Sequence, residues 1–269
     1  MTFQTIKFEK NNHTAVIRLD RPERMNAVNE DMYREIQQAL RDIEADETIR
    51  ALIITGSVLK KGAKEKQAFC AGADLKEHSA GKRTRAQKRT YIELAHQTTH
   101  RLYEFPKPVI AAVNGPARGA GAEMALNCDF VIMAETASIA FPEIGLGTFI
   151  GGGVTHLLPT MVGMMKAKAL IYSGRVLDGK AAVAWGLAVK SVPVENLLDN
   201  ALQLAEELAE KAPLSIKSAK SRLQDSGSLD MKTVLTLETD AILSCMDTED
   251  WREGAKAFVE KRKPVYKGK

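Results

Sequence analysis

The chain has 269 residues, 45% of them hydrophobic, and its 38 Lys and Arg residues against 34 Asp and Glu residues give a net charge of +4. This length and composition are typical of one large globular domain with a sizeable core. The longest apolar runs fall short of a membrane span, and the basic charge is too small and too evenly spread for a nucleic-acid-binding surface. We therefore expect neither a membrane nor a nucleic acid as a partner.

The cysteine pattern and the N-terminal sequence both indicate the cellular compartment. Cys70, Cys128 and Cys245 are odd in number and far apart, so they give neither a disulfide framework nor a zinc-binding pattern. The opening residues "MTFQTIKFEKNN" lack the apolar segment of a secretory signal. A reducing compartment fits best, and we expect a cytoplasmic protein.

The first part of the chain alternates between strand and helix patterns. Asn29 can cap the first helix, Pro106 can end the second, and the charged residues 58–67 read as a loop. Strands are expected at 14–22, 50–57, 137–143 and 186–193, helices at 29–46, 83–105 and 154–174, and a strand, a glycine turn, a helix and a strand within 107–135. This alternation predicts an α/β fold.

The pattern changes after residue 194. Amphipathic helices without intervening strands are expected at 194–211, 212–226, 228–246 and 248–263. The chain therefore divides into an α/β core at residues 1–194 and a helical C-terminal region at residues 195–269.

The first stretch that could carry chemistry is "FCAGADLKE" at residues 69–77. Its small residues allow a ligand to approach the backbone closely. Asp74 can cap a helix that begins at Leu75. A plain loop-to-helix cap without any ligand is an equally good interpretation of this stretch alone.

The second stretch is "NGPARGAGAEMALNCDF" at residues 114–130. A glycine- and alanine-rich turn opens a helix, whose first N–H groups can hold a phosphate or stabilise an oxyanion. The dinucleotide fingerprint G-x-G-x-x-G is absent. Glu123 could simply favour the helix dipole. Its apolar neighbours instead suggest a buried carboxylate, which is either neutralised or functional.

The third stretch, "IAFPEIGLGTFIGGG" at residues 139–153, contains an isolated acid, Glu143, among apolar residues. One predicted strand leads away from Glu123 and another returns to Glu143, so the two carboxylates could meet. Paired carboxylates beside an oxyanion site are suited to adding water across a polarised double bond. A solvated turn residue remains the alternative for Glu143 on spacing alone.

Other candidates are weaker. His96 and His100 stand four residues apart on a predicted helix and could bind zinc, but no third ligand accompanies them, so a solvated helix face is favoured. Ser138 and Ser173 lack the G-x-S-x-G motif of serine hydrolases. For His156, packing or capping is favoured over catalysis.

In this order, the three stretches resemble the enoyl-CoA hydratase/isomerase family, the crotonase superfamily. The similarity runs from "IRLDRPERMNAVNEDM" to "AFVEKRKP" and so covers nearly the whole chain. The resemblance implies a crotonase-like spiral of ββα turns that binds acyl-CoA, followed by a C-terminal helical trimerisation region. It also implies a homotrimer or a dimer of trimers.

The resemblance implies catalytic roles as well. The backbone N–H groups of Ala73 and Ala120 match the oxyanion donors that polarise the thioester carbonyl. Most relatives have glycine at the second position, and alanine keeps the donor if its φ is negative. Glu123 and Glu143 match two glutamates that hold a water molecule, and the residue matching Glu143 delivers the proton to the α-carbon. Isomerases of the family often keep only the second acid.

Further positions match residues that bind CoA or the acyl group. Those matching the CoA-binding loops are Arg24, Met25, Ala71, Asp74, Leu75 and Lys76. The N–H of Gly151 matches one that faces the acyl site. Phe258 and Lys261 match residues that reach the CoA of a neighbouring subunit.

The resemblance therefore implies an enoyl-CoA hydratase, which adds water reversibly and syn to a trans-2-enoyl-CoA to give a 3-hydroxyacyl-CoA. An enoyl-CoA isomerase or a decarboxylase on the same fold is the alternative, and a non-catalytic binding relative is a third. CoA is part of the substrate, so we expect no separate cofactor and no metal. "GTFIGGGVTHLL" departs from the "GTIPGAGGTQRL" of many hydratases, so the acyl group stays open.

Overall fold

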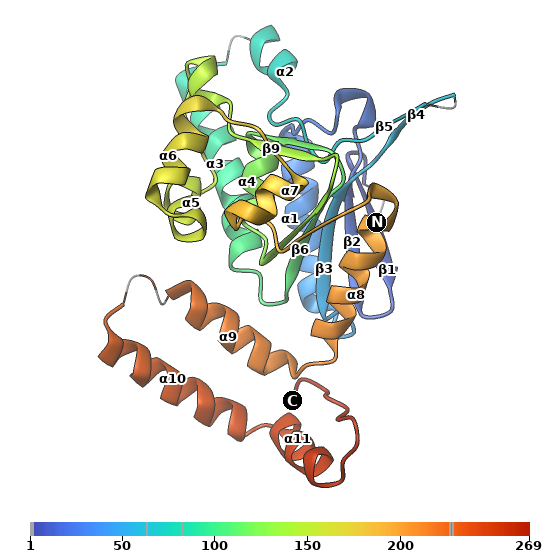
Figure 1. The fold of residues 1–269 in the computed structure, drawn as a ribbon, viewed down its shortest axis with the longest axis vertical. Coiled ribbons are helices and arrows are strands. Elements are labelled where there is room, and N and C mark those ends of the chain that lie inside the picture. The colour runs from blue at the N-terminus through green and yellow to red at the C-terminus, as the bar shows by residue number, and fades with distance from the viewer. Residues whose placement is uncertain (1–2, 63, 82, 226, 228) are drawn as a thin grey trace.

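The computed structural model describes residues 3–62, 64–81, 83–225, 227 and 229–269. Residues 63, 226 and 228, which fall within predicted elements, lie outside these ranges. Figure 1 shows an α/β body with the last helices of the chain below it. The strands are β1 (Ile6–Asn11), β2 (Thr14–Leu19), β3 (Ala51–Gly56), β4 (Leu59–Lys61), β5 (Lys64–Lys66), β6 (Val109–Val113), β7 (Pro116–Arg118), β8 (Phe130–Ala134), β9 (Ser138–Ala140), β10 (Leu177–Asp178) and β11 (Lys190–Val192).

The helices fill the intervals between the strands and the whole C-terminal region. The α-helices are α1 (Glu30–Ala45), α2 (Leu75–Ala80), α3 (Arg85–Tyr103), α4 (Ala120–Leu126), α5 (Val154–Val162), α6 (Met164–Ser173), α7 (Gly179–Trp185), α8 (Leu197–Ala209), α9 (Pro213–Asp225), α10 (Met231–Met246) and α11 (Glu249–Val259). Single 3-10 turns are η1 (Pro22–Arg24), η2 (Glu143–Leu146) and η3 (Val194–Asn196).

The main sheet has six strands in the order β1-β2-β3-β6-β8-β11. Only β1 and β2 are antiparallel, and the other neighbours are parallel. Every residue of β3 and β6 is buried, because helices cover both faces of a parallel sheet. The second sheet, β10-β9-β7, lies beside the first and carries the chain toward Glu143. The fold is thus the mixed α/β architecture that the sequence predicts.

Two helices show how the sheet is covered. Helix α1 begins where predicted, because the Asn29 side chain accepts a hydrogen bond from the Met32 amide over 3.0 Å. Helix α8 packs on strands of the sheet and buries Leu197, Ala201 and Ala205 in the core. The boundary predicted after residue 194 therefore falls before a helix that packs with the core. As a division into domains it stays a prediction.

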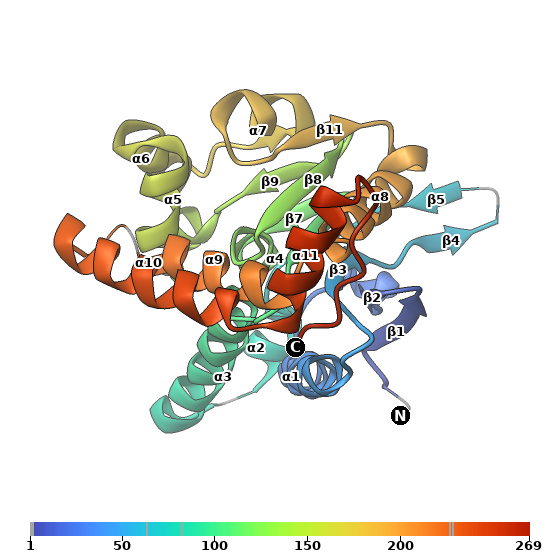
Figure 2. The same ribbon diagram turned by 90° about the horizontal axis from the view of Figure 1, so that it is seen from below.

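The remaining C-terminal helices form an arm, α9 to α11, that stands apart from the sheet (Figures 1 and 2). No residue of α10 is buried, although the helix carries many apolar side chains. Its exposed side chains include Ile242 at 59%, and Trp251 of α11 is 51% exposed. Exposed apolar area of this kind makes α10 and α11 a candidate interaction surface.

The structure corrects the sequence-based elements at three places. Residues 58–67 contain the antiparallel hairpin β4–β5 rather than only a loop. The helix predicted at 154–174 is two helices, because Gly163 adopts a φ of 81° between them. Strands β1, β7 and β10 and helix α7 were not predicted, since short or strongly charged segments lack a clear hydrophobic period.

Candidate active site

Residues 69–74 form an extended segment that is held on both edges. The amide of Ala71 donates to the carbonyl oxygen of Met25 over 3.0 Å. On the other edge, the amide of Arg118 donates to the carbonyl oxygen of Cys70 over 2.9 Å. The segment is thereby fixed beside β7 and the start of α4, although it lies far from both in sequence.

Two backbone donors meet where this segment passes α4. Among the described residues, the N–H groups of Ala73 and Ala120 have no hydrogen-bond acceptor. Ala120 is the first residue of α4, where N–H groups are free by geometry, and its helical φ is negative. A Cβ on Gly72 would lie 3.8 Å from the Ala120 nitrogen, so the segment lies directly against the helix start. The predicted role of both donors as an oxyanion hole stays a prediction.

Glu123 lies in the first turn of α4 and is 8% exposed. The amide of Gly151 donates to its Oε1 over 2.8 Å. Burial raises the pKa of Glu123 to about 7, and the negative charge of Glu143 adds to this effect against the opposing Gly151 hydrogen bond. The carboxyl group can therefore exchange a proton near neutral pH.

Glu143 begins η2, directly after β9 and Pro142, and is 9% exposed. Its Oε2 atom is buried and has no hydrogen-bond partner among the described residues. Burial raises the pKa of Glu143, which favours the protonated carboxyl group. A buried polar atom without a partner is costly in a folded protein, so this oxygen is a candidate contact for a ligand or a water molecule.

Gly119 brings Glu143 against the start of α4, the helix that carries Glu123. Its φ of 48° and ψ of −120° are open only to glycine. A Cβ at this position would lie 2.6 Å from Oε1 of Glu143. The fold therefore places both acids beside the start of α4, and their joint catalytic role stays a prediction.

Asn127, at the end of α4, fixes the other side of this site. Its Nδ2 donates to the carbonyl oxygen of Glu123 over 2.8 Å and to that of Gly152 over 2.7 Å. A Cβ on Gly152 would lie 2.7 Å from Cβ of Glu123, so only glycine fits. These supporting residues were not predicted, because nothing in their local sequence signals a long-range contact.

Asn26 anchors the loop that faces the extended segment. Its side-chain Nδ2 donates to the carbonyl oxygens of Ser57 and Ala68, each over 2.9 Å. Asn26 is fully buried and has a φ of 56°, a conformation that asparagine tolerates better than most residues. One side chain thus closes the base of the β4–β5 hairpin.

The predicted CoA-binding residues lie along one edge of this site. Arg24, Ala71, Leu75 and Lys76 are exposed, Met25 is half-buried with a φ of 54°, and Gly151 is half-buried. Asp74 differs, because its carboxylate caps α2 and forms an ion pair with Arg21 over 3.0 Å. Binding of CoA by these residues stays a prediction.

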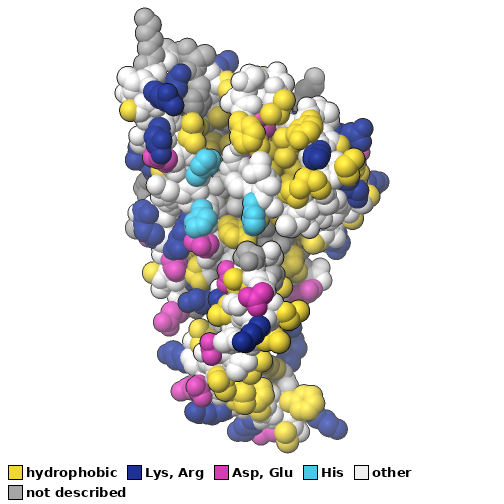
Figure 3. All heavy atoms as spheres, turned by 90° about the vertical axis from the view of Figure 1, so that its left-hand side faces the viewer, with side chains coloured by type: hydrophobic (Ala, Val, Ile, Leu, Met, Phe, Trp, Pro, Cys, Tyr) yellow, Lys and Arg dark blue, Asp and Glu magenta, His cyan; other side chains and the backbone are white. Residues whose placement is uncertain are grey.

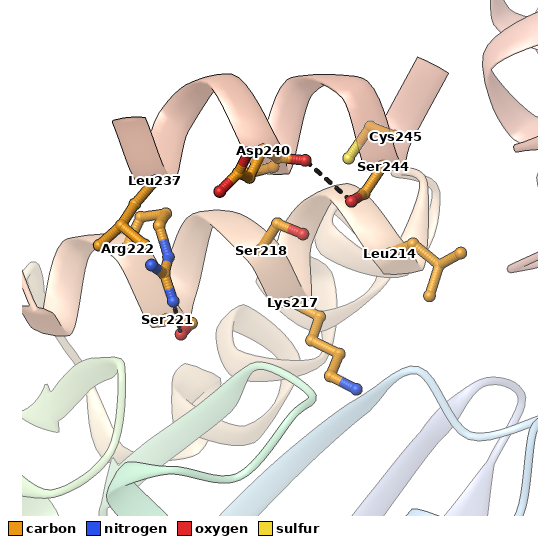
Figure 4. Close-up of a pocket in the computed structure, with 10 residues that line it drawn as sticks. Leu214, Lys217, Ser218, Ser221, Arg222, Leu237, Asp240, Ser244 and Cys245 are labelled. Atoms are coloured by element: carbon orange, nitrogen blue, oxygen red, sulfur yellow. Dashed lines mark hydrogen bonds between the residues drawn. The ribbon is translucent and has the colours of Figure 1, made fainter. Parts of the chain in front are cut away.

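Phe258 and Lys261 lie far from the other candidates within one chain. Both are exposed on or just after α11, at the lower end of the arm in Figure 1. The arm instead encloses a groove of about 480 Å³ between α9 and α10, which Figure 4 shows in close-up. Its residues include Lys217, Ser218 and Asp240. No acid pair or oxyanion donor lines it, so the catalytic candidates lie elsewhere.

His96 lies closer to the candidate site than expected. A Cβ on Gly151 would lie 3.0 Å from Nε2 of His96 and 3.3 Å from both carboxylate oxygens of Glu123. His100, one turn along α3, points instead to Glu104, at 3.3 Å. Both histidines are exposed, as expected for a solvated helix face, and Nε2 of His96 also lies beside Gly151.

Two further features of the described residues concern the predictions on metal binding and membrane crossing. No three His, Cys, Asp or Glu side chains in these ranges lie close enough together to hold a metal ion. None of the described helices is both long and apolar enough to cross a membrane. The expected absence of metals and cofactors stays a prediction.

A family model for enoyl-CoA hydratase/isomerase matches residues 9–269, so the chain belongs to this family. A crystal structure of an enoyl-CoA hydratase from Bacillus anthracis is similar, with a TM-score of 0.91 and 37% identity over 99% of this chain and 100% of that one. This similarity confirms the predicted crotonase-like fold.

Two curated relatives show the range of reactions in the family. A crotonyl-CoA hydratase from Syntrophomonas wolfei is 37% identical over 267 residues, which cover 99% of each chain. A 1,2-epoxyphenylacetyl-CoA isomerase from Escherichia coli (strain K12) is also 37% identical, over 93% of this chain and 94% of the other. Family membership therefore leaves the particular reaction open.

Proposed function

We propose that this protein is an enoyl-CoA hydratase that adds water reversibly and syn to a trans-2-enoyl-CoA. The observation that carries the proposal is the buried, unpaired Oε2 of Glu143 at the start of the helix that bears Glu123. Two acids in one pocket are what water addition requires, since a proton must leave the water and another must reach carbon. Relatives named as hydratases support the same reaction.

In the proposed mechanism, the N–H groups of Ala73 and Ala120 polarise the thioester carbonyl. Negative charge then develops on this oxygen as the oxygen of water attacks C3. Both glutamates hold the water, and Glu123 accepts one of its protons. The protonated Glu143 delivers a proton to C2, so that one molecule of water is added in all. The pKa of Glu123, raised to about 7, suits proton transfer near neutral pH, and the raised pKa of Glu143 favours its protonated form.

An enoyl-CoA isomerase remains the alternative, because some relatives of similar identity are named as isomerases. Such a reaction moves a proton between carbons and consumes no water. It needs one acid at the α-carbon, for which Glu143 is the candidate, and leaves Glu123 without a chemical role.

The decisive experiment follows the ultraviolet absorbance of the conjugated thioester in crotonyl-CoA, with product mass as a second reading. Wild type should convert it to a product heavier by one water. Glu123→Gln and Glu143→Gln should each lower the rate by about 10²-fold or more. Glu93→Gln, on the exposed surface of α3, is the matched control. Full activity in Glu123→Gln, or a product of unchanged mass, would contradict a two-acid hydratase.

We further propose that the protein assembles as a trimer or a dimer of trimers through the α9–α11 arm. The support is the exposed apolar side chains of α10 and α11, which one chain leaves uncovered. In such an assembly, Phe258 and Lys261 would reach the CoA of a neighbouring subunit. A cytoplasmic location is proposed on the sequence argument alone.

A further inference from the structure

The imidazole of His96 faces the proposed acyl site from a different element than either glutamate. Its Nε2 lies 3.0 Å from the position that a Cβ of Gly151 would occupy, and the Glu123 carboxylate lies 3.3 Å from that position. Gly151 in turn donates its N–H to Glu123. The ring nitrogen therefore borders the space in which Glu123 would meet its substrate.

The side chain of His96 is exposed on α3, so its imidazole is open to a ligand in the proposed site. One turn earlier on α3, Ile92 is 49% exposed, and Phe149, two residues before Gly151, is 70% exposed. Among the described residues, no hydrogen-bond partner of Nε2 is found. Figure 3 shows exposed histidine side chains on the face that it draws, with hydrophobic and acidic side chains near them. His96 thus places a hydrogen-bonding atom beside Gly151, on the side where the Glu123 carboxylate also lies.

We propose that His96 is a specificity-determining residue of the acyl site, where its Nε2 selects acyl groups that carry an oxygen substituent over plain alkyl chains. The inference rests on the proposed acyl-CoA site. An alkyl chain packed against Nε2 would remove water from the imidazole without replacing its hydrogen bond, which is unfavourable. A hydroxyl or similar oxygen restores that bond. A site that hydrogen-bonds a substituent discriminates against ligands lacking it.

The test compares ligands that differ by one oxygen and cannot react. Pentanoyl-CoA and its 4-hydroxy and 5-hydroxy derivatives are saturated, so calorimetry measures their Kd without turnover. We expect wild type to bind at least one hydroxy ester about fivefold or more tightly than pentanoyl-CoA. His96→Leu should abolish this preference, and His96→Gln should retain part of it. His100→Leu, on the same helix, is the matched control and should behave as wild type.

Several outcomes would overturn the inference: equal affinities for all three esters in wild type, an equal loss of affinity for all three in His96→Leu, or the same change in His100→Leu. The proposed reaction is tested separately, with pent-2-enoyl-CoA and its hydroxy derivatives. Selective binding without water addition would remove the hydratase proposal and support the role of His96. Water addition without selective binding would support the hydratase proposal and remove the role of His96.

Discussion

Gly119 and Glu143 are in such close contact that a single added carbon would collide with the carboxylate. A Cβ on Gly119 would lie 2.6 Å from Oε1 of Glu143. Gly119→Ala should therefore displace Glu143 and lower the rate with crotonyl-CoA by about 10²-fold, since small misplacements of reacting groups have effects of this size. Initial rates measure the loss of activity, and the thermal midpoint of unfolding measures any loss of stability.

The control for this substitution is Gly153→Ala. Gly153 also has a positive φ, 72°, but no atom lies within 4 Å of its Cβ position. The Gly153→Ala variant should lose about 1–2 kcal/mol of stability from backbone strain and keep most of its activity. Equal losses of activity in both variants would contradict a specific role of Gly119.

The pKa of Glu123 predicts a dependence of stability on pH. Its rise from 4.5 to about 7 means that the folded protein binds a proton here that the unfolded chain has already lost. The resulting stabilisation is complete below about pH 4.5 and disappears as the pH rises through 7. It amounts to about 3 kcal/mol. Urea unfolding should show the stability of Glu123→Gln rising relative to wild type between about pH 5 and pH 8.

Glu93→Gln serves again as the control, since the Glu93 carboxylate is exposed on α3 whereas that of Glu123 is buried. Its stability difference from wild type should stay constant over the same pH range. A constant difference for Glu123→Gln as well would show that Glu123 is not held protonated by burial.

Asn127 should matter for both stability and rate. Asn127→Ala removes the buried side-chain donor to the carbonyl oxygen of Gly152, which costs about 1–3 kcal/mol, while the carbonyl oxygen of Glu123 keeps the backbone N–H of residue 127. Asn200→Ala is the matched control, because Asn200 makes the same 2.8 Å bond to the carbonyl four residues earlier at an exposed site. Urea unfolding and initial rates should show losses only for Asn127→Ala, and equal effects would contradict its positioning role.

The exposed apolar face of the arm predicts an effect on assembly. Ile242→Glu places a charge on α10, where the side chain is 59% exposed in one chain. It should shift the protein from trimer or hexamer toward monomer in light scattering at micromolar concentration, because burying an unpaired charge in an interface is unfavourable. Phe8→Glu, at the edge strand β1, is the control and should leave the mass unchanged. An unchanged mass in Ile242→Glu would place the interface elsewhere.

Local signals explain most of what the sequence predicted. Asn29 and Asp74 cap helices through bonds to residues two or three positions ahead, so their motifs are readable without a fold. Glu123 and Glu143 were found because the family pattern names them and because apolar neighbours predict burial. The break at Gly163 was missed, since one glycine within an apolar helical pattern does not disclose its φ.

Other features depend on contacts between distant segments. His96 carries no local mark of its position, because its neighbour Gly151 lies on another element. The contact of Asn127 with Gly152 likewise arises only when α4 and the glycine turn pack together. Such pairs follow from tertiary packing, which hydrophobic periodicity does not encode.

The two hydrogen bonds of Asn26 have a consequence for how this chain can vary. They join Ser57 and Ala68 at the base of the β4–β5 hairpin, so the extended segment 69–74 starts from the same point whatever lies between them. Closing a longer loop adds only about 0.6 kcal/mol of entropy cost for each doubling of its length. The hairpin is therefore a place where residues can be inserted, or a reporter sequence grafted, without moving Ala73.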